Sequence, residues 1–107
     1  MEFSALSARA LEIRQRFSAR EQARGGREWT TEQVMEGLVV DVGDLMRLVM
    51  AKSGIRHVDN LDAKLEHELA DCLWSVLVLS HLYGIDLEKA FRRTMGELEV
   101  SLSKPAS

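Results

Sequence analysis

Apolar residues recur three and four positions apart along most of this chain of 107 residues, and this spacing is that of amphipathic α-helices. Glycines interrupt the pattern at Gly25-Gly26, Gly54 and Gly84, and the single proline, Pro105, lies near the end. The chain is long enough for one core only. We therefore predict an all-α fold, a compact four-helix bundle that forms a single domain over residues 1–107.

Residues that favour helix ends place the boundaries of these segments. Thr30 and Gln33 have the spacing of a capping box, which opens the second helix, and Asp86 is a suitable cap for the fourth. Gly84 is a typical helix stop. The expected helices run from residue 3 to about 24, from 31 to 53, from 61 to 83 and from 87 to at least 102.

Two carboxylate pairs lie on the apolar sides of the second and third helices. Asp41 and Asp44 are three residues apart, as are Glu68 and Asp71, so each pair presents its oxygens from one face of its helix. A single carboxylate in such a place is usually structural, but four with the same spacing need neutralisation, because burying an unpaired carboxylate costs several kcal/mol. Mg²⁺ prefers oxygen ligands. The sequence therefore predicts that these four side chains bind Mg²⁺, or Mn²⁺ in its place.

A di-iron carboxylate bundle is the competing kind of metal site. Such sites use a histidine three residues after a glutamate. The residues three positions before the three histidines are Gly54, Lys64 and Val78, so the spacing is absent. The sequence favours a Mg²⁺ site over a di-iron site.

Charge and composition limit the partners. The net charge of −3 gives no reason to expect nucleic-acid binding, and the most apolar stretch, Leu69 to Ile85, is too short for a membrane span. The lone Cys72 excludes an internal disulfide, suits a reducing compartment and is expected to act as a core residue. No signal peptide pattern follows Met1. We expect a cytoplasmic protein that binds neither nucleic acids nor membranes.

The third helix also predicts self-association. From Leu69 to Leu82 it is apolar nearly all the way round, and such a helix needs neighbours on most sides. Three short partner helices cannot surround it. Leaving one flank of the helix exposed to water would cost several kcal/mol, at about 25 cal/mol per Å² of exposed apolar surface. We expect an obligate homodimer or a dimer of dimers.

The carboxylate pairs and their surroundings resemble the MazG-like nucleoside triphosphate pyrophosphohydrolases. Asp41-x-x-Asp44, then 23 residues, then Glu68-x-x-Asp71 is similar to the family signature E-E-x-x-E … E-x-x-D. The stretch from Glu68 to Leu79 is similar to the second motif, and Gly84-Ile-Asp-Leu-Glu-Lys-Ala-Phe91 is similar to the turn that follows it. The resemblance extends from about Val34 to Met95.

The resemblance implies a Mg²⁺-dependent enzyme that hydrolyses NTPs or dNTPs to the monophosphate and pyrophosphate, as a house-cleaning enzyme of the nucleotide pool. The metal ligands of the family fall on Asp41, Asp44, Glu68 and Asp71, which would also be the catalytic residues. The metal would hold the phosphate oxygens, and one carboxylate would orient and deprotonate the attacking water. Lys52 matches a lysine of the family that would contact phosphate; the alternative is a solvated lysine at a helix end.

Several positions depart from the family pattern. Val40 stands in place of the first glutamate of the signature, and aspartates replace the next two. Thr94 and Leu98 are the best matches to a lysine and an asparagine of many relatives, and neither can bind phosphate as those do; Arg92 or Arg93 could substitute. These departures favour an alternative function, a non-catalytic helical module for nucleotide sensing or protein association.

Trp29 is the expected contact for the base of the nucleotide. The carboxylates fix the phosphate end, so the base should lie toward the start of the second helix, which Trp29 precedes. An aromatic face stacks on bases with little sequence preference. The alternative is that Trp29 packs on the first helix as a structural residue. Trp74, on the most apolar helix, is expected in the core or an interface.

Overall fold

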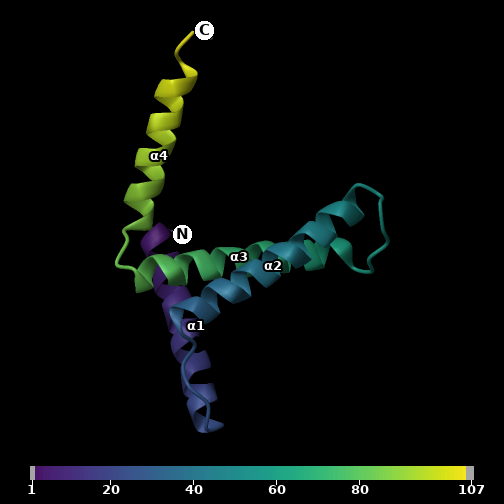
Figure 1. Ribbon diagram of the computed structural model, residues 1–107, viewed down its shortest axis with the longest axis vertical. Coiled ribbons are helices and arrows are strands. Elements are labelled where there is room, and N and C mark those ends of the chain that lie inside the picture. Colours follow the sequence, from purple (N-terminus) through teal and green to yellow (C-terminus); the bar gives the residue numbers. More distant parts are fainter. Residues whose placement is uncertain (1, 106–107) are drawn as a thin grey trace.

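The computed structural model describes residues 2–105 and contains four helices, with no strand among the described residues (Figure 1). They are α1 (Phe3–Ala23), α2 (Thr31–Lys52), α3 (Leu61–Leu82) and α4 (Leu87–Leu102). The predicted all-α class is confirmed, and each helix begins and ends within about one residue of its expected bounds. Helix ends depend on local signals, which the sequence carries directly.

Two of the predicted caps form as expected. Gln33 N–H donates to Thr30 Oγ1 at 3.2 Å, and Thr30 N–H donates to Gln33 Oε1 at 2.9 Å, which completes the capping box of α2. Lys89 N–H donates to Asp86 Oδ1 at 3.1 Å at the start of α4. Gly84 adopts a left-handed φ of 66°, which ends α3 and turns the chain into α4.

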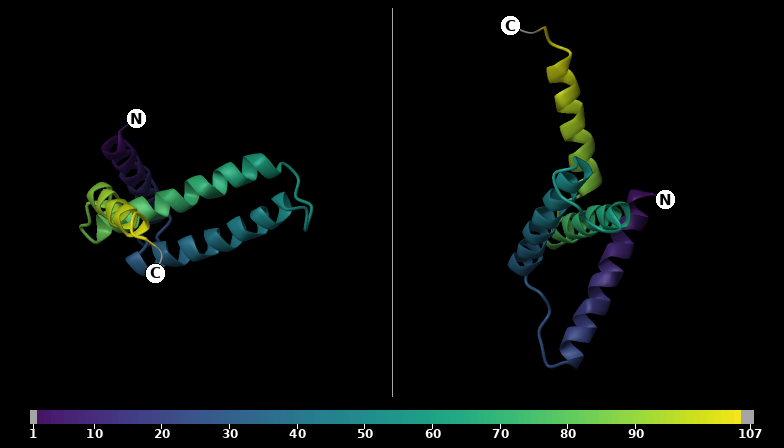
Figure 2. Two further views of the ribbon diagram at one scale, coloured as in Figure 1. Left: turned by 90° about the horizontal axis from the view of Figure 1, so that it is seen from above. Right: turned by 90° about the vertical axis from the view of Figure 1, so that its right-hand side faces the viewer.

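Helices α2 and α3 form a long antiparallel hairpin, which is the main packing unit of the chain (Figures 1 and 2). Helix α1 crosses the C-terminal half of α3, where Trp74 Nε1–H donates to the Ala10 carbonyl at 3.1 Å and Phe17 meets the Trp74 ring edge-on. Trp74 therefore joins α1 to α3 within one chain. The buried apolar side chains are Ala10, Val34, Leu48, Ala51, Leu77 and Val78.

Helix α4 stands away from the other three helices (Figure 1). It leaves α3 at a bend of 106°, and none of its residues is buried. The radius of gyration is 17.4 Å, whereas a compact chain of this length has about 13 Å. The four predicted helices are present, but a single chain does not close them into a compact bundle, because α4 diverges from α3 at this bend and does not pack along α1 or α2.

No single helix of the described residues is both long and apolar enough to cross a membrane, although the bent pair of α3 and α4 reaches that length and composition when counted together.

Candidate metal centre

The antiparallel hairpin brings the two carboxylate pairs together. Asp41 and Asp44 extend from α2, Glu68 and Asp71 from α3, and all four are partly buried. Oxygens of Asp41, Asp44 and Glu68 lie within 4.8 Å of one another, which is close enough for one cation to bind all three. A second group within the same limit contains His67, Glu68 and Asp71, so Glu68 belongs to both groups.

Crowding and burial make the charged forms of two of these carboxylates less favourable than in a freely solvated side chain. The pKa of Asp41 is raised by burial first, and then by the charges of Asp71 and Asp44, with a smaller opposite effect of His67. The pKa of Glu68 is raised by burial first, and then by Asp41, Asp44 and Asp71. A bound cation would offset this repulsion and favour the charged forms.

Glu68 provides an independent observation that fits a metal ligand. Its Oε2 atom is buried and has no hydrogen-bond partner in the described chain. A buried polar oxygen of this kind normally has a donor or an ion beside it. The oxygen donors of Asp41, Asp44 and Glu68 are the ligands that Mg²⁺ and Mn²⁺ prefer, so the residues present fit a hard divalent cation.

His67 belongs to the site and was not among the predicted site residues. Its Nε2 lies 3.0 Å from Asp71 Oδ2, one helical turn further along α3. The imidazole is largely exposed, so the pair lies at the solvent edge of the carboxylate cluster. The signal was present in the sequence, because residues four apart on a helix are neighbours.

Cys72 lies beside the cluster and is partly buried. Burial raises the pKa of its thiol, and the charges of Asp41, Glu68 and Asp71 raise it further. The thiol therefore stays protonated at neutral pH, where a nucleophilic cysteine needs the thiolate. This agrees with the interpretation of Cys72 as a packing residue.

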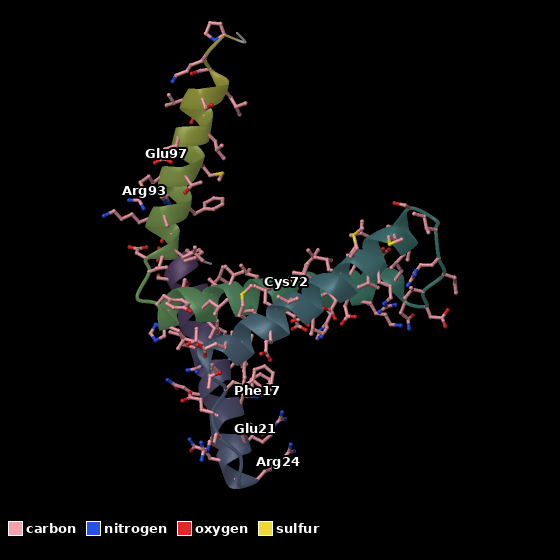
Figure 3. The ribbon with its side chains drawn as sticks, viewed as in Figure 1. Phe17, Glu21, Arg24, Cys72, Arg93 and Glu97 are labelled. Atoms are coloured by element: carbon pink, nitrogen blue, oxygen red, sulfur yellow. The ribbon has the colours of Figure 1, made fainter. Side chains whose placement is uncertain are left out.

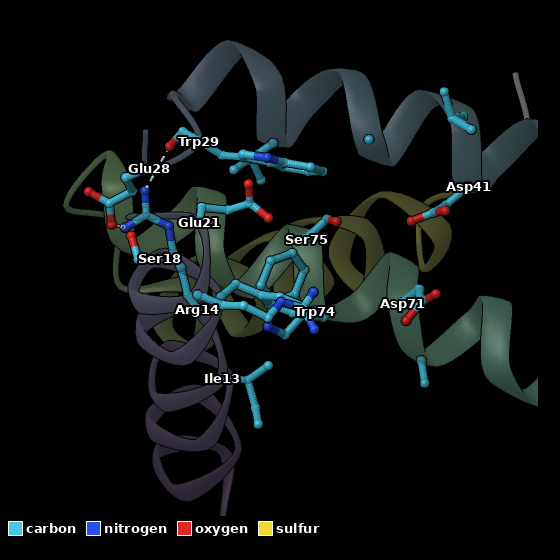
Figure 4. A pocket seen from close by; sticks show the side chains of 16 residues that line it. Ile13, Arg14, Ser18, Glu21, Glu28, Trp29, Asp41, Asp71, Trp74 and Ser75 are labelled. Atoms are coloured by element: carbon cyan, nitrogen blue, oxygen red, sulfur yellow. Dashed lines mark hydrogen bonds and ion pairs between the residues drawn. The ribbon is translucent and has the colours of Figure 1, made fainter. Parts of the chain in front are cut away.

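A cavity of about 770 Å³ opens next to the carboxylates, between α1, the segment before α2, and the α2–α3 hairpin (Figure 4). Asp41 and Asp71 face each other at one end of it, and Trp29 and Trp74 lie on opposite sides of its wider part. The rest of the lining mixes apolar and polar side chains. It includes Ile13, Phe17 and Val34, together with Arg14, Ser18, Glu21, Glu28 and Ser75.

Trp29 lines this cavity and is about half exposed, at 49 %. Its ring rests on α2 at Gly37, where an added Cβ would come within 3.4 Å of Cζ3. Arg14 of α1 holds the segment that precedes α2 in place. Its Nη2–H donates to the Trp29 carbonyl at 3.1 Å, and its Nη1 pairs with Glu28 at 3.0 Å. The segment before α2 thus holds Trp29 in the wider part of the cavity whose other end carries Asp41 and Asp71.

Lys52 lies at the other end of α2, away from the cavity. Its Nζ is 2.6 Å from Asp62 Oδ1 of α3, next to the loop of the hairpin. It follows Asp44 by eight residues, which is roughly 12 Å along the helix axis at 1.5 Å per residue. Within one chain, Lys52 is therefore not brought to the carboxylate cluster.

The family model of the MazG nucleotide pyrophosphohydrolase domain matches residues 29–99, well over half of the chain. The chain therefore belongs to the MazG family of all-α nucleotide pyrophosphohydrolase domains. The matched segment contains Trp29 and both carboxylate pairs, whereas α1 lies outside it. No curated protein and no solved structure gives a significant match to the chain.

Proposed function

We propose that this protein is an enzyme that hydrolyses nucleoside triphosphates, NTPs or dNTPs, to the monophosphate and pyrophosphate. The observation that carries the proposal is the convergence of Asp41, Asp44 and Glu68 within 4.8 Å, in a chain of the MazG family. A divalent cation bound there would neutralise phosphate charge and favour deprotonation of water. Removal of surplus or noncanonical nucleotides in the cytoplasm is the role we assign to this activity.

The carboxylates of the cluster would have different roles at the phosphate end of the nucleotide. Asp41, Asp44 and Glu68 would hold Mg²⁺ or Mn²⁺. Asp71 is oriented by its contact of 3.0 Å with His67, which leaves its second oxygen free as a ligand or as the acceptor of the proton from water. This assignment uses all four predicted carboxylates and adds His67 as a positioning residue.

The cavity beside the carboxylates would take the nucleoside. Its volume of about 770 Å³ lies within the usual range for small-molecule sites, about 300–1,000 Å³. Trp29 offers an aromatic face for stacking on the base. The buried Oγ of Ser18 has no partner in the described chain, and it lines the cavity together with Glu21 and Ser75, so these groups could hydrogen-bond the base edge.

Pyrophosphate release from a panel of NTPs and dNTPs, with Mg²⁺ or Mn²⁺ present, tests the proposal. We expect turnover of at least one nucleotide, with the monophosphate as the second product. Asp71→Asn should lower that turnover at least about 100-fold, because even outer partners of metal ligands typically contribute about 10–100-fold. Circular dichroism should show an unchanged helix content for the variant. No turnover of any nucleotide by the wild-type protein would contradict the proposal.

A non-catalytic nucleotide-binding module is the second candidate. It is favoured by Val40, which lines the cavity without offering an oxygen ligand, and by the pairing of Lys52 with Asp62. Calorimetry separates the two functions: a nucleotide that binds tightly in the presence of Mg²⁺ and is recovered intact would support the module.

A further inference from the structure

Glu21 of α1 brings a carboxylate into the cavity, away from the cluster that fits a metal ion. The side chain is partly buried, and it forms neither an ion pair nor a side-chain hydrogen bond with any described residue. Figure 4 shows it on the side of the cavity that carries Trp29 and Trp74, whereas Asp41 and Asp71 lie at the other end. If the metal holds the phosphates, Glu21 lies at the nucleoside end of the cavity.

The arginines that line the same cavity do not neutralise Glu21. Arg14 pairs with Glu28 at 3.0 Å, and the guanidinium of Arg20 lies over the Phe17 ring, with Cζ 5.2 Å from the ring centre. Phe17 and Glu21 are one helical turn apart, on the part of α1 that extends beyond the α2–α3 hairpin (Figure 3). The oxygens of Glu21 therefore need hydrogen-bond donors from water or from a ligand in the cavity.

The turn after α1 packs closely against Glu21 and limits the positions open to its side chain. Gly26 N–H donates to the Glu21 carbonyl at 2.8 Å. A Cβ at Gly26 would lie 3.3 Å from Glu21 Oε2, which is a tight contact, so a residue with a side chain there would push against the carboxylate. The backbone of this turn thus helps to hold the carboxylate toward the cavity.

The Watson–Crick edges of the bases differ in the donors that they offer to a carboxylate, which accepts hydrogen bonds and donates none. Guanine presents two adjacent donors, N1–H and the N2 amino group, and these match the two oxygens of one carboxylate. Adenine and cytosine present one amino group beside a ring nitrogen that is an acceptor. Uracil and thymine present one N–H between two carbonyl oxygens, which a carboxylate repels. A carboxylate at the base edge therefore favours guanine.

We propose that Glu21 makes this cavity selective for guanine nucleotides. Its carboxylate accepts hydrogen bonds from N1–H and from the N2 amino group of the base, while Trp29 stacks on the ring. The proposal rests on the proposed function, since the cavity must be the nucleoside site. Hydrogen bonds to a charged group are the stronger kind, so the loss of one of the two should weaken binding at least about 10-fold.

Calorimetry with α,β-methylene triphosphates, which cannot be hydrolysed between the α and β phosphates, tests the selectivity without turnover. Inosine is the matched ligand, because it differs from guanosine only in lacking the N2 amino group. With Mg²⁺ present, the wild-type protein should bind the guanosine analogue at least about 10-fold more tightly than the inosine analogue, and the uridine analogue least tightly. Equal affinities, tighter binding of another base, or no binding at all would overturn the proposal. The expected order of affinities without hydrolysis of any natural nucleotide would contradict the proposed function alone.

The variant Glu21→Gln assigns the selectivity to this side chain. The amide keeps the size of the carboxylate but turns an N–H donor toward one of the two donors of guanine, so the preference for the guanosine over the inosine analogue should fall at least about 10-fold. Glu12→Gln is the matched control, because Glu12 lies on the same helix, pairs with Arg9 and Arg16 and does not line the cavity; the preference should stay unchanged. An unchanged preference in Glu21→Gln, or equal losses in both variants, would overturn the proposal.

Discussion

At the scale of single residues, the carboxylate cluster opposes folding when no metal neutralises it. Asp41 and Glu68 have pKa values above their ordinary values of 3.8 and 4.5, so both bind protons more tightly in the folded chain than in the unfolded chain. A group of this kind stabilises the fold fully below its unfolded pKa, and this contribution is lost as the pH rises through the folded pKa.

The metal-free protein should therefore lose stability between about pH 4 and neutral pH through these two groups. Urea midpoints measured with a chelator across this range would show the loss. Asp41→Asn removes one of the two titrating groups and one of the repelling charges. The urea midpoint of this variant should therefore fall less over the same pH range than that of the wild type. Parallel pH profiles of variant and wild type would contradict the role of Asp41.

His67 should tune the metal site through Asp71. His67→Ala removes the contact of 3.0 Å that orients the Asp71 carboxylate, so we expect metal affinity to fall about 10-fold, the lower end of outer-partner effects. Metal titration followed by calorimetry measures the change. His57→Ala is the matched control, because His57 pairs with Asp59 in the loop between α2 and α3 and should leave affinity unchanged.

At the scale of helices, the two tryptophans have different tasks. Trp29→Ala should raise KM about 10-fold, since stacking contributes about 1–3 kcal/mol per base, and should change the melting temperature little because the ring is half exposed. Trp74→Phe should instead lower stability by about 1 kcal/mol, because the Ala10 carbonyl loses its donor. Kinetics and thermal unfolding of both variants decide the assignment. A large loss of stability in Trp29→Ala with unchanged KM would identify Trp29 as structural.

The elements that local signals control could be predicted from the sequence. Most contacts between distant segments could not, and the meeting of the two carboxylate pairs is the exception. The capping box at Thr30 and the stop at Gly84 determine helix ends through contacts between residues that are close in the sequence. The 3.6-residue repeat of the helix places Asp41 and Asp44 on one face. The pairing of Lys52 with Asp62 and the direction of α4 depend on how helices cross, which no local pattern specifies.

At the scale of the whole molecule, metal binding and folding should be coupled. A ligand that binds only the folded state stabilises it, by about 2.7 kcal/mol at 100 times its Kd. Saturating Mg²⁺ should therefore raise the melting temperature, a chelator should reverse the shift, and Asp44→Asn should abolish most of it. Equal shifts in the variant and the wild type would place the metal elsewhere.

The contact of Arg14 with Glu28 and the Trp29 carbonyl has a consequence for how this protein can change over time. It joins α1, which lies outside the segment matched by the family model, to the segment that carries Trp29. Under the proposed function, one wall of the nucleoside cavity thus belongs to a part of the chain without any of the four carboxylates. Substitutions in α1 can alter which base is accepted while the hydrolytic chemistry is inherited intact, so selectivity and catalysis are free to evolve separately.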